Sequence, residues 1–364
     1  MILRGGLDGL TAVPPHGDPS YHALRSENAA GVRLGSASPI ALDGFFSLNP
    51  SLKSLGSMFR QGEAIVFHAV ATPYRDRCHF DGLSVLENGT RSPGLETGWL
   101  NRALSVLPTE RFVGQRLPGI GVGATAPLIL RGPAPTLTWS PQAVAMDLLN
   151  GRERLRDLSS TIDPTFADAI ERRAGLQALA RGGPMTESRV PAGRSGFIEL
   201  AAGAGRLLNA PEGPRVAVMS FDGWDTHTRQ GAEDGRLSRL LADFDAALDT
   251  LRSTLRKAWA ETVVIAVTEF GRTVRLNQTY GTDHGTGSVA FLAGGALRGG
   301  YVAADWPGLN NSALYEHRDL RPTQDVRRVL KGILADHLSI PEILLSREVF
   351  PESSSASPLR DLCV

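Results

Sequence analysis

Cysteine is almost absent from this chain of 364 residues, which contains only Cys78 and Cys363. Two isolated cysteines exclude a disulfide framework and a cysteine-based zinc motif. Long apolar runs are also lacking, and no run approaches the ~20 residues of a membrane-spanning helix. The chain as given carries no signal peptide. The sequence therefore describes neither a small secreted disulfide scaffold nor a protein with a transmembrane segment.

An excess of charge of either sign is missing too. Lys and Arg together number 38, as do Asp and Glu, so the formal net charge is zero. This balance argues against nucleic acid or an anionic membrane as the obligate partner, and any function that depends on charge must be local. Apolar residues at 42% and charged residues at 21% are typical of a globular chain that is long enough for a large core.

Apolar runs of strand length recur along the chain and predict buried strands at Ala64–Pro73, Arg215–Phe221, Thr262–Phe270 and Ser288–Leu297. Between the second and third of these runs, leucines at helical spacing predict a long amphipathic helix. Strand, helix and strand in this order indicate parallel strands with a right-handed crossover. We therefore expect an α/β fold with a mostly parallel sheet and helices on both faces. Thr323 is the expected N-cap of a closing helix.

Two segments fit this pattern less well. Residues 91–211 are rich in Gly and Pro and predict an inserted or cap-like middle region, or added strands at Ala126–Leu130 and Thr136–Trp139. Charged helical patterns and a flexible connector follow within the same region. The opening "MILRGGLDGL" provides only a short strand, whereas about five or six residues are usual. We expect that the natural chain begins upstream and that a targeting segment precedes this start.

Acids, histidines and other reactive side chains gather where the predicted strands end or begin. These residues are Asp8, Cys78, His79, Asp222, Asp225, His227, Glu269, Arg272, Asp283 and His284. In an open parallel sheet, the loops at the carboxyl ends of the strands share one edge and form the ligand crevice. Residues more than two hundred positions apart are therefore expected to meet there.

Carboxylates and imidazoles without a set of cysteines suit a hydrolytic metal centre. We expect one or two divalent ions, whether zinc, manganese, iron or magnesium, to be held by Asp8, Asp222, Asp225, His227, Asp283 and His284. Such ions polarise a phosphoryl-type oxygen and activate a nucleophile. Glu269 is predicted as a further ligand or general base, and Arg272 as a bidentate clamp on an anion. His79 is predicted as an acid or as a contact to the leaving group.

Each of these positions also has a purely structural interpretation. Asp8 before Gly9 is a common turn pair, and Glu269 with Arg272 can form a structural ion pair. His79 can be a core histidine with its hydrogen bonds satisfied, or a hydrogen-bonding residue at the start of a helix. Cys78 can be a nucleophile at the start of a helix, but we favour its interpretation as a small buried residue. The case for a site depends on all the clusters falling at strand ends.

Several motifs together resemble a known family. They are "LRGGLDGL", "HAVATPYRDRCHFDG", "FDGWDTHTRQ", "VTEFGRTVRLN", "GTDHGTGSVAFLAGGALRGG" and "LYEHRDLRPTQDVRRVLKGIL". In this order they resemble the uncharacterised bacterial family of domain of unknown function 1501, which is similar to the alkaline phosphatase and sulfatase superfamily. The resemblance covers nearly the whole chain and is weakest in the middle region. It implies an alkaline-phosphatase-like fold and a twin-arginine export signal before the first strand, hence a periplasmic or exported protein; without such a signal, a cytoplasmic protein is expected.

The superfamily resemblance also implies a two-metal site. Asp8 resembles the ligand after the first strand, Asp222 or Asp225 with His227 resembles an Asp and His pair, and His284 resembles the late histidine ligand. "TEFGRT" departs from the superfamily, which has an Asp-His pair where this chain has Glu269. "CHFDG" lacks the Cys-x-Pro-x-Arg motif of sulfatases, so conversion of Cys78 to formylglycine is not expected.

Two functions are compatible with these features. The first is a metal-dependent hydrolase of phosphate or sulfate esters that acts on a small-molecule or polymer ester at the carboxyl edge of the sheet. The second is a non-catalytic binding or assembly protein on a degenerate phosphatase-like scaffold, because no Ser or Thr stands at the expected nucleophile position.

Overall fold

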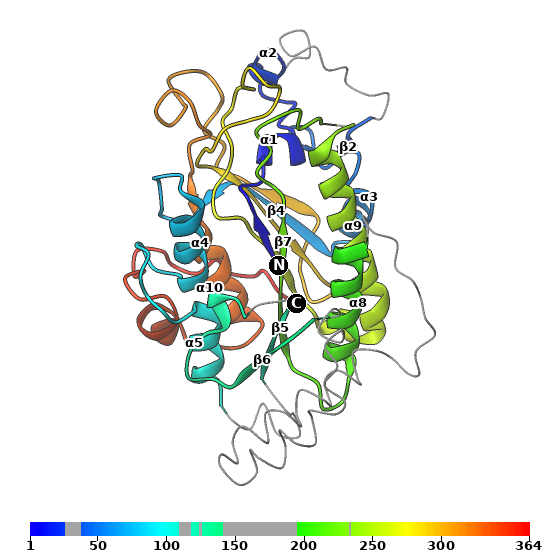
Figure 1. Ribbon diagram of the computed structural model, residues 1–364, viewed down its shortest axis with the longest axis vertical. Helices are drawn as coiled ribbons and strands as arrows, with labels where there is room; N and C mark the ends of the chain where they lie inside the picture. The colour runs from blue at the N-terminus through cyan, green and yellow to red at the C-terminus, as the bar shows by residue number, and fades with distance from the viewer. Residues whose placement is uncertain (26–37, 109–117, 124–125, 141–194, 233) are drawn as a thin grey trace, which may run out of the picture.

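A computed structural model of the chain describes residues 1–25, 38–108, 118–123, 126–140, 195–232 and 234–364. The strands and helices of these residues form a mixed α/β body with a central parallel sheet, as predicted (Figure 1). The charged helical patterns and the connector predicted within 141–194 lie outside the described residues.

One half of the sheet is entirely parallel. Its strands follow the order β1, β7, β5 and β6, with the bounds Ile2–Arg4, Val216–Asp222, Gly119–Val122 and Thr136–Trp139. The register pairs Ile2 with Ser220 and Gly119 with Val216. The described strands of the middle region therefore extend the main sheet beyond β7, in agreement with the prediction of a strand at Thr136–Trp139. The strand predicted at Ala126–Leu130 is wrong, because Leu128–Leu130 form a 3-10 helix whose buried side chains give the same apolar run.

The other half follows the order β10, β4, β9 and β8, and β11 also pairs with β4. The bounds are β4 Ala64–Ala71, β8 Val264–Ala266, β9 Ser288–Ala293, β10 Tyr301–Ala303 and β11 Gln324–Asp325. A parallel bridge between Ile2 and Val267 joins this half to β1. Strand β9 runs antiparallel to both β4 and β8, so the loop that precedes it opens at the edge where its neighbours end.

Helices lie on both sides of the strands in Figure 1. One side carries α3 (Lys53–Arg60), α8 (Ser195–Asn209) and α9 (Arg236–Leu255), and the other carries α4 (His79–Asn88), α5 (Trp99–Val106) and α10 (Val326–Asp336). The shorter helices are α1 (Gly9–Ala12), α2 (Tyr21–Arg25) and α11 (Glu342–Leu344). No helix in the described part of the chain combines the length and hydrophobicity needed to cross a bilayer.

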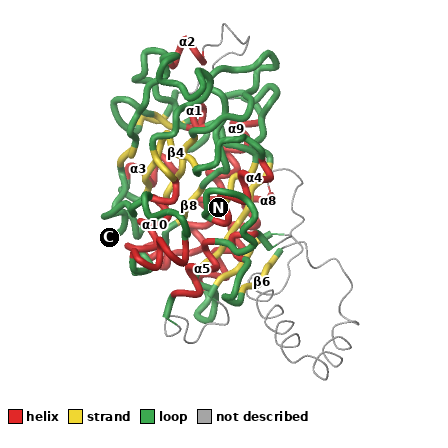
Figure 2. The backbone as a smooth tube through the Cα atoms, turned by 90° about the vertical axis from the view of Figure 1, so that its left-hand side faces the viewer, coloured by secondary structure: helices red, strands yellow, loops and turns green. Residues whose placement is uncertain are grey.

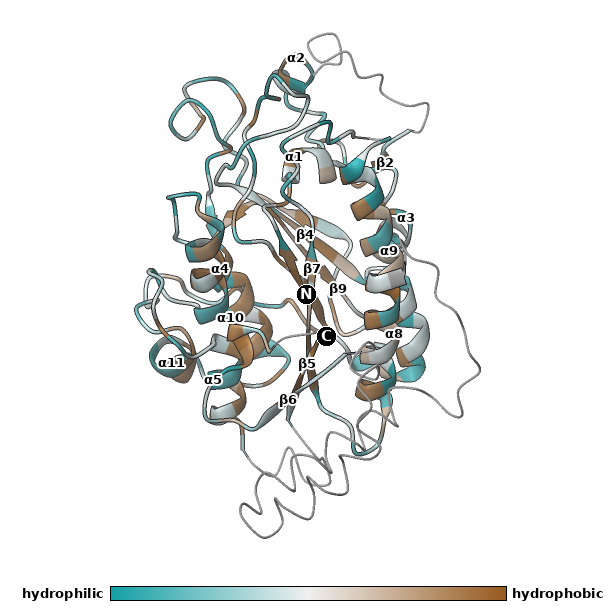
Figure 3. Cartoon of the chain, viewed as in Figure 1, coloured by the Kyte–Doolittle hydropathy of each residue, from teal (hydrophilic) through white to brown (hydrophobic). Residues whose placement is uncertain are grey.

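Strand β4 shows why the sheet is covered twice. All eight of its residues are buried. Successive side chains point to opposite faces of a strand, and here Val66 belongs to the core under α3 and α9 while Ile65 and Phe67 belong to the core under α4, α5 and α10. Figure 3 shows the same pattern, with the central strands coloured mostly hydrophobic. A continuous apolar run is thus the expected sequence for this position.

Loops gather at the end of the molecule that carries α1 and α2 (Figure 2). Strand β1 ends at Arg4 and α1 begins at Gly9, so this end is the carboxyl edge of the parallel strands. The helix expected after Thr323 begins three residues later, at Val326. Its N-cap is Asp325, whose Oδ1 accepts a 2.9 Å hydrogen bond from the Arg327 N–H, while the Thr323 N–H bonds to the Ala69 carbonyl.

His68 is a buried histidine of β4, and contacts with two backbone groups determine which of its ring nitrogens carries a proton. Its Nδ1 accepts from the Ala69 N–H at 2.8 Å, and its Nε2 lies 3.0 Å from the Val13 carbonyl oxygen, which can only accept. The neutral ring satisfies both partners, and a proton on Nδ1 would break one of them. Burial lowers the pKa of His68 to about 4 from the ordinary 6.5.

The free energy of unfolding should consequently fall as the pH is lowered, because His68 resists protonation in the folded protein. Between pH 6.5 and about 4 the unfolded chain binds a proton at this residue that the folded chain does not, so the free energy of unfolding falls as pH falls. At about pH 5 the loss is roughly 2 kcal/mol. Urea unfolding at about pH 7 and 5 should show that the His68→Gln variant loses less stability than the wild type by roughly this amount. Equal losses in the two proteins would contradict the prediction.

Candidate metal centre

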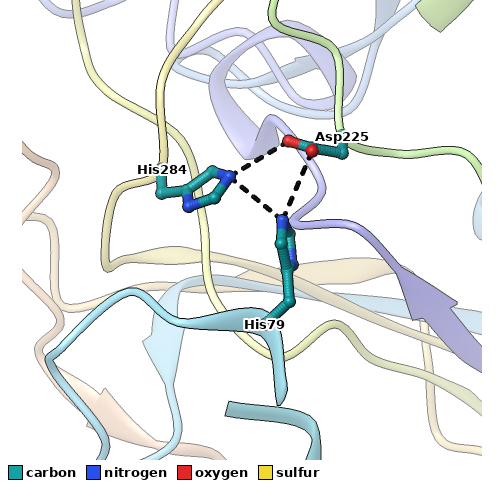
Figure 4. A group of neighbouring side chains, drawn as sticks. All are labelled: His79, Asp225 and His284. Carbon is teal, nitrogen blue, oxygen red and sulfur yellow. Dashed lines mark hydrogen bonds and ion pairs between the residues drawn. The ribbon is translucent and has the colours of Figure 1, made fainter. Parts of the chain in front are cut away.

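Three side chains from distant parts of the chain point toward one another at the carboxyl edge of the sheet (Figure 4). His79 is the first residue of α4 and follows β4, and Asp225 lies in the loop after β7. His284 lies in the loop before β9 and reaches the same edge because β9 is antiparallel. One ligand atom of each side chain lies within 4.8 Å of the other two, so the three form a possible metal-binding triad.

The separations within this triad fit a first-row divalent ion. His79 Nε2 is 3.0 Å from His284 Nε2, His284 Nε2 is 3.2 Å from Asp225 Oδ1, and His79 Nε2 is 3.5 Å from Asp225 Oδ2. Ligand atoms at ordinary zinc distances around a tetrahedral ion lie about 3.4 Å apart. A cation between these atoms would therefore need only small side-chain movements.

A third imidazole adjoins the triad. His227 Nε2 lies 3.0 Å from His284 Nε2 and 2.9 Å from Asp225 Oδ1. The His227 side chain is 42% exposed and the Asp225 side chain 39% exposed, whereas His284 is more buried at 26%. The group is therefore open to solvent on the side of His227, and His227 is available as a further ligand.

The Nδ1 atom of each imidazole, on the side of the ring away from the triad, contacts a hydrogen-bond acceptor. His79 Nδ1 lies 2.8 Å from Glu269 Oε1, His227 Nδ1 lies 3.2 Å from Asp283 Oδ1, and His284 Nδ1 lies 2.9 Å from the Arg77 carbonyl oxygen. Carboxylates and carbonyls accept hydrogen bonds, so these partners assign the ring proton to Nδ1. The Nε2 lone pairs of His79 and His284 are therefore available to the triad, and that of His227 lies beside His284 and Asp225. Metal-binding histidines are typically oriented by acceptors placed in this way.

The ionisation of the group follows from these contacts. The hydrogen bond to Glu269 raises the pKa of His79 despite partial burial, whereas burial lowers the pKa of His284. A hydrogen bond from Asn277 lowers the pKa of Asp283, with a further contribution from His227. The positions of the three Nε2 atoms favour a positive charge between them, since neutral lone pairs at 3.0 Å repel one another.

Asp225 is kept ionised by Arg272. Burial raises the cost of its charge, but the 2.6 Å hydrogen bond from Arg272 Nη1 holds the pKa of Asp225 below its usual value. The Arg272 side chain is fully buried, and its other nitrogens donate to the Thr282 side chain and backbone. Arg272 therefore orients a carboxylate of the group and has no guanidinium edge free for the bidentate anion clamp expected from the sequence.

Close backbone approach brings the loops together, and glycine is required at two points. Gly5 has φ +126°, and a Cβ there would lie 2.3 Å from the Asp225 backbone nitrogen. Gly271 would place a Cβ 1.8 Å from the Gly287 carbonyl oxygen. Its own carbonyl accepts from the Gly285 N–H at 2.8 Å, which fixes the loop that carries His284 beside the loop that follows β8. A side chain at either glycine would separate these loops.

Glu269 lies behind the group and not at its centre. Its carboxylate is buried, and it accepts from the Gly5 N–H at 2.8 Å and from the Thr268 hydroxyl at 2.9 Å, in addition to its contact with His79. It can therefore hold the His79 ring in place, as Asp283 does for His227. The expected role of Glu269 as a direct ligand or general base does not match this position.

Other residues predicted for the site lie apart from the triad. Asp8 is buried and forms a bidentate ion pair with Arg25, at 2.6 and 3.0 Å. Its Oδ2 also accepts from Thr11 and Gln230. Asp222 is the exposed last residue of β7, and Cys78 is an exposed residue just before α4. None of the three is within the group His79, Asp225 and His284.

Several partners that complete the site could not be found by sequence reasoning. The Arg77 carbonyl orients His284 as any residue at that position could, so no pattern of side chains reveals it. Asn277 bonds to Asp283 and to the His227 carbonyl; it is the last residue of the motif "VTEFGRTVRLN", but that motif alone does not show which residues it contacts. Arg25 pairs with Asp8 and so keeps it apart from the triad. In the sequence Arg25 is only an arginine in a short helix, and nothing there indicates this ion pair.

Residues 2–341 match the family described as "Protein of unknown function (DUF1501)". The chain belongs to this family. The match spans nearly the whole chain and confirms the family resemblance of the sequence motifs. No curated protein and no solved structure matches this DUF1501 protein.

Proposed function

We propose that this protein is a metal-dependent hydrolase of phosphate or sulfate esters with its active site at His79, Asp225, His227 and His284. The observation that carries the proposal is the triad of His79, Asp225 and His284 with the His227 imidazole beside it, and an acceptor at every imidazole Nδ1. Sets of histidine and carboxylate ligands suit zinc, iron or manganese better than magnesium. We therefore expect one such ion.

The chain's own residues define what the site can do. His79, His284 and Asp225 would bind the ion, and His227 would complete its ligands from the solvent side. Glu269 and Asp283 would fix the ring orientations, and Arg272 would keep Asp225 ionised. When bound, the ion supplies polarisation of a phosphoryl or sulfuryl oxygen and activation of water near neutral pH. Water as the nucleophile would also remove the need for a Ser, Thr or Cys in the group.

The position of the group supports an ester substrate. It lies where strands of an α/β sheet end, which is the usual ligand crevice of such folds. The family motifs resemble the alkaline phosphatase and sulfatase superfamily, and we propose a fold of that kind with a ligand set of its own. In this interpretation Asp8, which resembles a superfamily ligand, has become part of a buried ion pair with Arg25.

Purified protein loaded separately with zinc, manganese, iron(II) or magnesium should hydrolyse a chromogenic ester. The panel needs a phosphate monoester, a phosphate diester and a sulfate ester. We expect turnover on one of these classes that depends on the added metal and is lost in the His227→Ala variant. The His16→Ala variant is the matched control, because it removes an exposed imidazole outside the group.

Tight metal binding without turnover on any of the three ester classes would contradict the hydrolase and favour the non-catalytic binding or assembly protein. Turnover that persists in His227→Ala at the wild-type rate would instead place the chemistry elsewhere. Circular dichroism of both variants separates loss of the fold from loss of the site.

A further inference from the structure

A second polar cleft lies beside α10 and is distinct from the histidine group. It has a volume of about 390 Å³ and is formed by the segment after β4, the segment around β11, and residues near the C-terminus. Its lining includes Arg75, Arg91, Arg327 and Arg328 but only one carboxylate, Asp325. The cleft therefore concentrates positive charge in a protein with no net charge.

The one carboxylate of the cleft, Asp325, already accepts hydrogen bonds from Arg327. Asp325 Oδ2 accepts from Arg327 Nη2 at 2.7 Å, and its Oδ1 caps α10 through the Arg327 N–H at 2.9 Å. Arg75, Arg91 and Arg328 form no ion pair with any residue in the described part of the chain. Arg75 donates to the Thr72 and Tyr74 carbonyls and Arg328 to the Ser357 carbonyl, so backbone oxygens and not counter-ions hold them.

Two buried donors in the cleft lining have no acceptor. The Arg327 side chain is only 3% exposed, yet its Nη1 makes no hydrogen bond to any described residue. The same is true of Gln324 Nε2. Buried donors are almost always paired, and an unpaired cationic donor is the costliest kind. Both residues line the cleft, so a ligand there would bring acceptor atoms next to the side chains that carry these donors.

We propose that this arginine cleft binds a phosphate-type oxyanion, either free or as part of a small phosphorylated molecule. Guanidinium groups match the oxygens of phosphate in bidentate fashion, and α10 adds the positive end of its dipole at Asp325–Arg327. Four arginines against one carboxylate favour a dianion over a singly charged carboxylate ligand. The volume falls in the range of ordinary small-molecule sites.

Isothermal titration calorimetry with inorganic phosphate tests the cleft independently of the metal centre. The protein should first be treated with a chelator, so that phosphate cannot bind through a metal, and titrated at roughly pH 8 where a phosphate-type group is dianionic. We expect binding that the Arg91→Gln/Arg328→Gln double variant weakens at least roughly tenfold. Arg91 is exposed and Arg328 half-buried, so this variant should fold.

The matched control is Arg239→Gln, which removes an exposed arginine on α9 and should leave the affinity within about twofold of the wild type. A phosphorylated sugar as second probe distinguishes a site for free phosphate from one for a phosphorylated molecule. Absence of phosphate binding, equal binding in the double variant, or acetate binding as tight as phosphate would each overturn the proposal. None of these outcomes bears on metal binding at the histidines.

Discussion

Replacement of His284 by alanine should abolish tight metal binding while the protein remains folded. His284 is central to the group, since its Nε2 lies 3.0 Å from the Nε2 atoms of both His79 and His227. Loss of one ligand from a four-ligand zinc site removes roughly a quarter of a binding free energy of about 10–16 kcal/mol, which lowers affinity by roughly 60- to 900-fold. Metal content after dialysis and competition with a chromogenic chelator measure the loss.

The fold should tolerate this change because His284 makes few structural contacts. Its Nδ1 bonds to the Arg77 carbonyl, and the loop is also held by the hydrogen bond from Gly285 to Gly271. We expect a stability cost of about 1 kcal/mol from the lost hydrogen bond. His16→Ala should retain the wild-type metal affinity. Equal metal content in His284→Ala and the wild type would disprove the metal centre.

The sheet could be predicted from the sequence because burial on both faces leaves a direct signature. All eight residues of strand β4, Ala64–Ala71, are buried, and all but His68 are apolar. The direction of β9 could not be predicted, because a buried strand has the same apolar sequence whether it runs parallel or antiparallel to its neighbours. The middle region could not be assigned from its Gly and Pro content, yet β5 and β6 extend the main sheet.

Strand ends also located most of the site, because the carboxyl edge of a sheet gathers residues that are distant in the sequence. Asp225, His227 and His284 meet there with His79. The roles of the residues were harder to predict than their convergence. A glutamate that binds a metal and one that holds a histidine from behind have the same side chain, and only the 2.8 Å contact of Glu269 with His79 Nδ1 separates the two.

Asp8 illustrates the limit of a motif most clearly. The sequence "GGLDGL" places an acid directly after the first strand, as a ligand would be. Whether that acid faces a metal or a cation depends on Arg25, which is seventeen residues away in a short helix. Ion pairs of this kind are set by tertiary structure, and no local spacing predicts them.

Substitution of Asp8 by asparagine should therefore destabilise the protein strongly and leave the metal centre intact. Asp8 is 1% exposed and Arg25 5% exposed at the side chain, and burial opposes the charge of each. Arg25 nevertheless holds the pKa of Asp8 below its usual value. Removal of one partner leaves the other charge buried and unpaired, at a cost of about 3–5 kcal/mol. Urea denaturation measures this loss.

The double variant Asp8→Asn/Arg25→Met should recover part of the lost stability, because no unpaired charge then remains in the core. It also keeps the test decisive if the single variant fails to fold. Metal affinity of whichever variant folds should stay within about threefold of the wild type, since Asp8 is occupied by Arg25, Thr11 and Gln230. Loss of metal at wild-type stability would instead show that Asp8 is a ligand and that the ion pair opens when metal binds.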